Sequence, residues 1–338
     1  MERRSSPGAR PLASISVLVF LVALGAEAAA EPPRHQNPIV RQRADPWVYR
    51  HTDGWYYFAA SVPEYDRIEI RRARTIQGLG SAPAVVVWRR HDNGIMSANI
   101  WAPEIHSISG SWYIYFAAAE RDAPFNHRVY VLENESADPL AGQWMEKGQI
   151  QTGWQSFSLD ATEFDHGSVH YLVWAQKDFG IRGNSNLYIA AMSNPWTISG
   201  KAVRISKPEF PWERRGYWVN EGPAVLARNG RVFITYSASA TDASYCMGML
   251  TASDAADLLD PASWVKSSLP VLQTDAAAGI YGPGHSSFTV DGEYDILVYH
   301  ARAYRDIAGD PLYDPNRDTR AQAVAWNPDG TPQFEPAR

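Results

Sequence analysis

The chain has 338 residues, a net charge of −6 at pH 7 and one cysteine, Cys246. This length allows one large all-β domain or two smaller domains. The acidic balance argues against nucleic-acid binding, which requires a concentrated basic surface, and a lone cysteine excludes intramolecular disulfides and a cysteine-based zinc site.

The first 30 residues have the pattern of a signal peptide. Three arginines precede an apolar run at 12–24, and the small residues Ala28, Ala29 and Ala30 follow it. The run is short for a membrane span. We therefore predict a removed signal peptide at 1–30 and a mature protein at 31–338 that is secreted or periplasmic and not bound to a membrane. A retained membrane anchor is the alternative interpretation.

One pattern occurs five times along the rest of the chain. In each copy a turn glycine leads into an aromatic and β-branched run, which is typical of a buried strand. The copies lie at 54–61, 110–117, 167–174, 230–237 and 292–299. Their first glycines are 56, 57, 63 and 62 residues apart, a spacing that fits four strands with long loops per repeat. Because helical periodicity is scarce, the sequence predicts an all-β fold, a single five-bladed β-propeller, with a pair of β-sandwiches as the alternative.

A titratable residue precedes each of the five repeats. In chain order these residues are Asp45, Glu104, Asp160, Glu221 and His285. In a propeller, the innermost strand of every blade lines one central channel. We therefore expect these side chains to converge on the axis, although they are far apart in sequence.

Acidic side chains that share a low-dielectric pocket are expected to take different roles, because burial and like charges raise some of their pKa values. Cleavage of a glycosidic bond needs two such roles. One protonated acid donates a proton to the leaving oxygen, and one carboxylate takes a proton from the attacking water. Asp45, Asp160 and Glu221 are the candidates. Glu104 is interpreted as a buried structural acid, and His285 as a hydrogen-bonded core histidine.

The motifs around these acids resemble those of glycoside hydrolase family 43, a family of inverting, five-bladed propeller enzymes that act on arabinan and xylan. The resemblance covers residues 37–326. Asp45 in the run Ala-Asp-Pro resembles the family's general base, and Asp160 in Leu-Asp-Ala resembles its third acid, which tunes and orients the general acid. Glu221 in Asn-Glu-Gly-Pro resembles the general acid itself. Longer runs at 45–49, 60–67, 219–225 and 236–241 are similar to the exo-α-1,5-L-arabinofuranosidase branch, which removes single arabinose units from non-reducing ends of arabinan.

The resemblance also implies contacts to the sugar. Trp101 and Phe116 match aromatic residues that lie beside the cleaved sugar, and Tyr281 and Arg302 are further candidate substrate contacts. His285 resembles a central histidine that in many relatives lies by a calcium ion or a water. A structural calcium at the propeller axis therefore stays an open option, with His285 as its neighbour, and no organic cofactor is required. The expected partner is arabinan or another arabinose-containing polysaccharide or oligosaccharide, and the expected state is a monomeric catalytic domain.

Three other functions stay open at this point. A β-xylosidase or bifunctional enzyme would use the same three acids in a differently shaped pocket. An endo-arabinanase would cut internal bonds, and the loops at 121–126 and 179–184 would decide whether the pocket is closed at one end. A propeller lectin would bind glycans without cleaving them. Lectin repeats are expected to repeat their binding residues, however, whereas the axial residues here differ from blade to blade.

Overall fold

The structure is a computed structural model that describes residues 1–2, 8 and 31–334. The chain divides into two units, Met1–Pro32 and Pro33–Arg338. The predicted signal peptide at 1–30 lies almost wholly outside the described residues. Within the described part of the chain, no helix is both long enough and apolar enough to cross a membrane.

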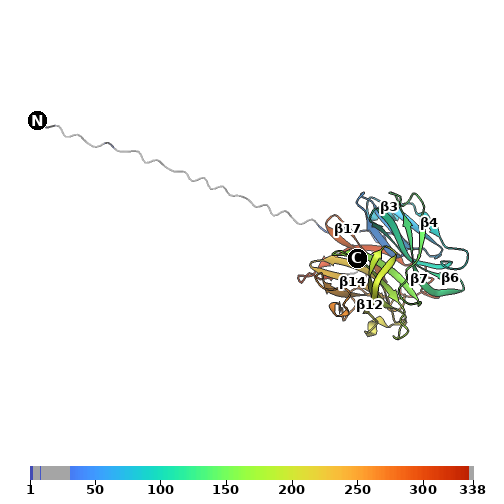
Figure 1. The fold of residues 1–338 in the computed structure, drawn as a ribbon. Helices are drawn as coiled ribbons and strands as arrows, with labels where there is room; N and C mark the ends of the chain where they lie inside the picture. The colour runs from blue at the N-terminus through green and yellow to red at the C-terminus, as the bar shows by residue number, and fades with distance from the viewer. Residues whose placement is uncertain (3–7, 9–30, 335–338) are drawn as a thin grey trace. The chain divides into compact units, whose positions relative to one another are not determined.

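The second unit is built from antiparallel sheets that follow one another in chain order (Figure 1). Each of the first four sheets has four strands. The first comprises β1 (Ala44–Arg50), β2 (Tyr56–Ser61), β3 (Arg67–Ala73) and β4 (Val85–Arg89). The second comprises β5 (Ala98–Ile108), β6 (Ser111–Glu120), β7 (Ala123–Asn134) and β8 (Met145–Gln149). The third comprises β9 (Ser158–His166), β10 (Val169–Gln176), β11 (Asn186–Asn194) and β12 (Thr197–Ser206). The fourth comprises β13 (Asn220–Arg228), β14 (Arg231–Ala238), β15 (Cys246–Ser253) and β16 (Val265–Lys266).

The fifth sheet is completed by the beginning of the second unit. Its own strands are β17 (Tyr281–Asp291), β18 (Tyr294–Arg302) and β19 (Asp318–Ala323). Val40 forms an antiparallel bridge with Thr319 of β19, and the Thr319 N–H donates to the Val40 carbonyl at 2.9 Å. The segment that leads into the first sheet thus pairs with the last sheet.

The remaining elements are short. Outside the five sheets, the described part contains one two-stranded ribbon and three 3-10 helices. They are β20 (Ala325–Trp326), β21 (Pro332–Gln333), η1 (Gln77–Gly80), η2 (Pro211–Glu213) and η3 (Pro261–Ser263).

Five hydrophobic cores join neighbouring sheets. Tyr57 and Trp112, for example, are buried between the first and second sheets. Val48 and Val298 are buried between the first and fifth sheets, so the last blade packs against the first and the ring is closed. The five predicted strand segments are the second strands of the blades, and the predicted single five-bladed β-propeller is confirmed. Burial of apolar surface between blades is the main stabilising contribution, since no disulfide can form.

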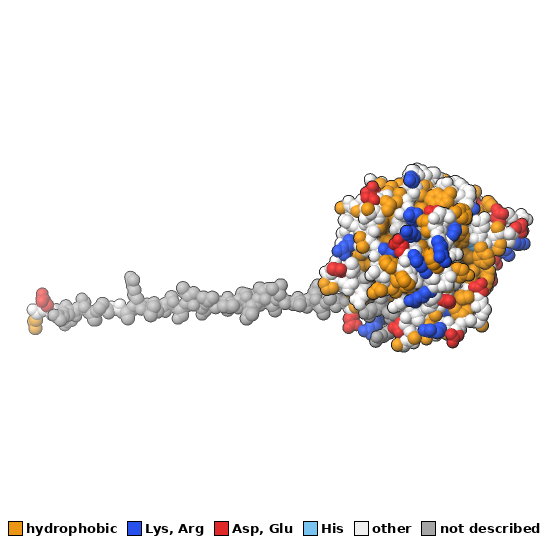
Figure 2. All heavy atoms as spheres, turned by 90° about the horizontal axis from the view of Figure 1, so that it is seen from below, with side chains coloured by type: hydrophobic (Ala, Val, Ile, Leu, Met, Phe, Trp, Pro, Cys, Tyr) orange, Lys and Arg blue, Asp and Glu red, His pale blue; other side chains and the backbone are white. Residues whose placement is uncertain are grey.

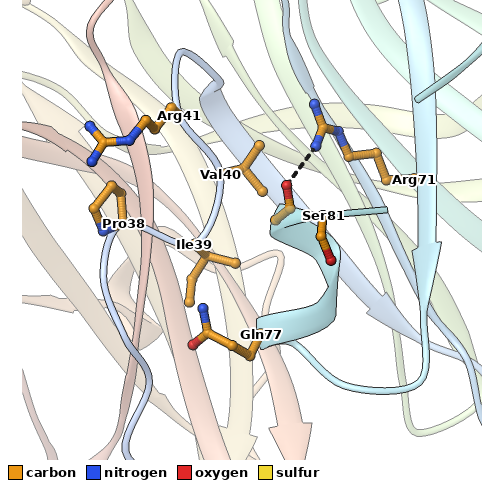
Figure 3. A pocket seen from close by; sticks show the side chains of 8 residues that line it. Pro38, Ile39, Val40, Arg41, Arg71, Gln77 and Ser81 are labelled. Atoms are coloured by element: carbon orange, nitrogen blue, oxygen red, sulfur yellow. Dashed lines mark hydrogen bonds between the residues drawn. The ribbon is translucent and has the colours of Figure 1, made fainter. Parts of the chain in front are cut away.

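The closing segment also lines a pocket of about 430 Å³ (Figure 3). Ile39 and Val40 lie on one side of it, and η1 with Ser81 lies on the other. A side chain at Gly80 would place Cβ 2.4 Å from the Ile39 carbonyl oxygen, so glycine is required for this close approach. None of the predicted acids lines this pocket.

The face drawn in Figure 2 shows Lys and Arg side chains interspersed with Asp and Glu side chains. Charged side chains of both signs therefore occur together on this face.

Candidate active site

A second cavity, of about 960 Å³, brings the three predicted acids together. Asp45 from β1, Asp160 from β9 and Glu221 from β13 all line it, and each carboxyl group therefore comes from a different blade. Trp101 from β5 and His285 from β17 also line it, so all five innermost strands contribute. Four of the five side chains that were expected to converge, those of Asp45, Asp160, Glu221 and His285, thus line one cavity, whereas Glu104 does not.

The same β-bulge occurs in all five innermost strands. In each, two residues stand opposite one residue of the second strand, and the first of the two has a positive φ. These first bulge residues are Asp45 (φ 54°), Ala102 (φ 46°), Asp160 (φ 52°), Gly222 (φ 54°) and His285 (φ 43°). Such a backbone costs about 1–3 kcal/mol at residues other than glycine, and it re-aims the side chain at this level of the channel.

The bulge shows that the five predicted titratable residues do not all occupy equivalent positions. Asp45, Asp160 and His285 occupy equivalent positions, but Glu221 precedes its bulge residue and Glu104 follows Ala102 by two positions. Glu104 is buried, contacts His106 at 3.0 Å and does not line the cavity. Its interpretation as a buried acid agrees with this position.

Asp45 is surrounded by groups that favour its ionised form. The Ser61 hydroxyl donates to Asp45 Oδ2 at 2.6 Å, and Arg317 Nη1 lies 3.4 Å from Oδ1. Burial opposes ionisation of Asp45, but the charge of Arg317, aided by the neighbouring histidines, holds the pKa of this carboxyl well below its usual range. Burial lowers the pKa of His300 to about 3, so this ring is neutral and its Nδ1 accepts a hydrogen bond of 3.0 Å from the Asp45 N–H.

The surroundings of Glu221, unlike those of Asp45, favour the protonated form of the carboxyl group. Burial raises the pKa of Glu221 to about 7, and the charge of Asp45 acts in the same direction. The Tyr245 hydroxyl donates to Glu221 Oε1 at 2.9 Å and moderates this rise. Near neutral pH, Glu221 can therefore carry a proton while Asp45 is ionised.

Asp160 is linked to the Glu221 strand through the backbone. Asp160 Oδ2 accepts a hydrogen bond of 3.0 Å from the N–H of Gly222. Burial raises the pKa of Asp160 well above its usual range, and the charges of Glu221 and Asp45 add to this effect. Asp160 and Glu221 thus both hold protons more tightly than an ordinary carboxyl group.

His285 lies beside two of the acids. Its Nδ1 is 3.3 Å from Asp45 Oδ1 and 4.0 Å from Asp160 Oδ2, and burial lowers the pKa of the ring. In the residues that the structure describes, no group of three or more His, Cys, Asp or Glu side chains is arranged to hold a metal ion. A calcium ion beside His285 therefore stays a prediction from the family resemblance, and the side chains alone account for the chemistry of the site.

Trp101 lies in the cavity wall and stacks on a buried histidine. Its ring centroid is 3.9 Å from that of His127, with 19° between the planes. Burial lowers the pKa of His127 to about 4, so the ring beneath Trp101 is neutral. The supported indole can offer an aromatic face to a ligand in the cavity, and its contact with the sugar stays a prediction.

The other predicted substrate contacts are placed differently. Phe116 is 1% exposed and packs on Trp88 and Tyr130 in the core, because it stands opposite the bulge on β6 and points between blades. Arg302 is 1% exposed and binds Asp314. The prediction that these two side chains touch the substrate is therefore wrong. Tyr281 is partly exposed and does not line the cavity as described, so its contact stays a prediction.

Arg302 instead lies outside the cavity and binds two segments of its wall. Its guanidinium donates to the carbonyls of Thr241 and Pro311 at 2.7 Å each, and both of these residues line the cavity. Arg302 thereby holds two loops of the wall in place.

Two site residues were missed by sequence reasoning. Arg317 precedes β19, and Tyr245 precedes β15, so neither belongs to the repeated strand nor to the innermost strand. Arg317 is 5% exposed and also donates to the Tyr65 hydroxyl at 2.7 Å. No periodicity marks these positions, and only the closed ring brings them to the acids.

The arrangement supports acid–base chemistry on one bound sugar. An ionised carboxylate can take a proton from water, and a protonated carboxyl can donate one to a leaving oxygen. The two carboxyl groups come from different blades, and the cavity between them is large enough for a sugar unit.

Comparison with known proteins agrees with this chemistry. A family model described as glycosyl hydrolases family 43 matches residues 35–332. The chain is 57% identical over 326 residues to an extracellular exo-α-(1→5)-L-arabinofuranosidase of Streptomyces avermitilis, which covers 96% of this chain and 68% of that protein. It is 54% identical to a protein of the same name from Streptomyces chartreusis, over 85% of this chain and 88% of the other.

A solved structure is also similar to this chain in both sequence and fold. The crystal structure of an α-L-arabinofuranosidase from Lactobacillus brevis superposes with a TM-score of 0.86 at 56% identity, over 88% of this chain and 95% of that one. The fold and the family resemblance predicted from the motifs are thereby confirmed, and the chain belongs to glycosyl hydrolases family 43.

Proposed function

We propose that this protein is an exported, inverting exo-α-1,5-L-arabinofuranosidase, with residues 31–338 as its catalytic domain. It would release L-arabinose from the non-reducing ends of arabinan and arabino-oligosaccharides and act as a monomer. The names of its relatives from Streptomyces avermitilis and Streptomyces chartreusis support the activity and the extracellular location. The single observation that carries the mechanism is the opposed ionisation of Asp45 and Glu221 within one cavity.

In this mechanism each acid has one role. Glu221 donates its proton to the glycosidic oxygen as the bond to the anomeric carbon breaks. Asp45 takes a proton from the water that attacks the anomeric carbon from the opposite face. Asp160 holds the peptide after Glu221 and forms a coupled pair of carboxyl groups with it. This pair releases a proton only at higher pH than a single carboxyl group would, so that Glu221 can carry the proton until it is needed. The face of Trp101 packs against the apolar side of the furanose ring.

A time course of products from linear arabinan tests this proposal. We expect arabinose as the only early product, released first in the anomeric form opposite to that of the substrate. Early oligosaccharides would favour an endo-arabinanase, and retention of the anomeric form would contradict the assigned roles.

Two further substrates separate the remaining functions. Faster hydrolysis of an aryl β-D-xyloside than of an aryl α-L-arabinofuranoside would favour a β-xylosidase. Binding of arabinan without any product would favour a lectin. The five bulge positions carry aspartate twice and alanine, glycine and histidine once each, and this variation favours one shared catalytic centre over repeated binding sites.

A further inference from the structure

A chain of alternating carboxyl and imidazole groups leads away from the active site inside the protein. Glu104 Oε2 lies 3.0 Å from His106 Nε2, and His106 Nδ1 lies 2.9 Å from Glu163 Oε1. His170 Nδ1 then lies 3.3 Å from Glu163 Oε2 and 2.8 Å from Asp165 Oδ1. We call these five residues the carboxylate–imidazole chain. They come from β5, β9 and β10, in two neighbouring blades.

The chain runs from the buried channel to the surface at the far end of the strands. The exposed fractions of its side chains are 5% for Glu104, 3% for His106, 11% for Glu163, 17% for His170 and 78% for Asp165. On β9 the cavity residue Asp160 lies near the first end of the strand, and Asp165 lies next to the hairpin turn at the other end. One end of the chain therefore lies close to the catalytic acids in the fold, and the other end meets solvent.

His106 is positively charged in this setting. Both ring nitrogens face carboxylate oxygens, so both carry hydrogens. Burial opposes this charge, but the hydrogen bonds to Glu104 and Glu163 raise the pKa of His106 to about 9. The ring is held in place by Trp47, at a centroid distance of 4.5 Å, and by the edge of Tyr115, at 5.3 Å.

Glu104 titrates in the same pH range as the catalytic acid. Burial raises the pKa of Glu104 to about 7, and the bond to His106 moderates the rise. The groups that face it are His106 on its own strand, Asp160 and Glu163 on β9, and Tyr115 on β6. Tyr49 on β1 faces Glu163. Glu104 and Asp160 lie on β5 and β9, two innermost strands that contact each other, and the charge of Glu104 adds to burial and to the charges of Glu221 and Asp45 in raising the pKa of Asp160.

We propose that Glu104 is a positioning residue for the catalytic acid: its carboxylate, anchored on His106, supplies negative charge behind Asp160 and so keeps the proton on the Asp160–Glu221 pair. Glu163, on the other side of His106, holds the ring charged, and His170 and Asp165 connect the cluster to solvent. The inference rests on the proposed function, because it concerns the same proton.

The physical reason is the sign of the charge. A negative group near Asp160 and Glu221 disfavours a further negative charge on that pair, so the pair releases its proton only at higher pH. Glutamine at position 104 keeps an acceptor for His106 but removes the charge. The pair should then lose its proton at lower pH.

The test compares three amide variants by their pH profiles of kcat/KM on an aryl α-L-arabinofuranoside. In Glu104→Gln the basic limb should move to lower pH by about one unit, the size that a nearby unit charge produces inside a protein. In Glu163→Gln the shift should have the same sign and be smaller, because that carboxylate lies beyond His106. Asp165→Asn is the matched control on the same strand; its charge is screened by water, so the limb should stay in place.

The outcomes distinguish an electrostatic effect of Glu104 on the Asp160–Glu221 pair from a purely structural role of Glu104. An unmoved basic limb in Glu104→Gln, with lower kcat or lower thermal stability, would overturn the inference. An equal shift in all three variants would do the same. If Glu104→Gln does not fold, Glu163→Gln decides alone, since it must still move the limb to lower pH.

A measurement without turnover separates this inference from the proposed function. NMR of the His106 ring nitrogens in the parent protein should show both carrying hydrogens at pH 7. A neutral ring there would contradict the charged cluster whatever the enzyme hydrolyses. Conversely, a parent that does not cleave arabinofuranosides would contradict the proposed function and leave the ring measurement standing.

Discussion

Asp160 Oδ2 accepts a hydrogen bond of 3.0 Å from the N–H of Gly222, the residue that directly follows Glu221. The third acid thus fixes the backbone beside the catalytic acid as well as the local charge. In Asp160→Asn the amide oxygen can still accept this hydrogen bond, but the second ionisable carboxyl group beside Glu221 is lost. We expect kcat to fall about 10²-fold and the basic limb of the pH profile to move to lower pH. Asp160→Ala, which also loses the acceptor, should be the more damaging change in the same assay.

Replacement of the candidate base should abolish most activity at any pH. In Asp45→Asn no carboxylate remains to take a proton from water, so we expect kcat to fall by about 10²–10⁴-fold on arabino-oligosaccharides, with little change in KM. Steady-state kinetics on arabinotriose measure this.

A matched control loses a buried carboxylate away from the cavity. Asp295 pairs with Arg228 at 2.7 Å, and Asp295→Asn should lower thermal stability while kcat is retained. Near-parent turnover by Asp45→Asn would show that another group activates water.

The role of Glu221 should be visible in the leaving-group dependence. Glutamine cannot protonate the glycosidic oxygen, so Glu221→Gln should be strongly impaired on arabinan, whose leaving group is an alcohol. Aryl arabinofuranosides with acidic phenols need no such help, and their rates should fall far less. A series of aryl substrates of graded acidity measures this slope. Equal losses on all substrates would argue against Glu221 as the proton donor.

Arg317 should control the acidic limb of the pH profile. Its charge lowers the pKa of Asp45, so the base is ionised, and activity persists, down to low pH. In Arg317→Met the pKa of Asp45 rises, the carboxylate takes up a proton at higher pH, and the acidic limb moves upward. Arg317→Lys keeps a positive charge and should shift less. A profile of kcat/KM between pH 3 and 7 would reveal an unmoved limb, which would contradict this assignment.

Gly284 links the stability of the protein to the catalytic acid. A Cβ at this position would lie 2.4 Å from Tyr245 Cε1, and Tyr245 donates to Glu221. We expect Gly284→Ala to reduce the free energy of unfolding by about 1–3 kcal/mol and to lower kcat by displacing this tyrosine. Gly180→Ala, where the nearest atom belongs to the Asp178 side chain, serves as the control. Thermal unfolding and arabinofuranosidase assays on both variants check the pair of effects.

The amino-acid sequence by itself determined the number of blades and singled out three candidate acids. Turn glycines followed by aromatic and β-branched runs specify hairpins locally, and five copies at nearly constant spacing allow few other folds. The three acids were predicted because each precedes a repeat, and the motif around Glu221 also carried the family resemblance.

Only the tertiary structure decided which way each side chain points and what charge it carries. The sequence placed Glu104 and Phe116 near the predicted axis. A bulge in β5 shifts the register by one residue, so Glu104 lies outside the cavity and Phe116 packs in the core. Arg317 and Tyr245 reach the acids from positions outside the repeat, because closure of the ring brings distant loops together. Arg317 keeps Asp45 ionised, whereas burial raises the pKa of Glu221 against the opposing hydrogen bond from Tyr245. Such a difference depends on three-dimensional surroundings that no local pattern encodes.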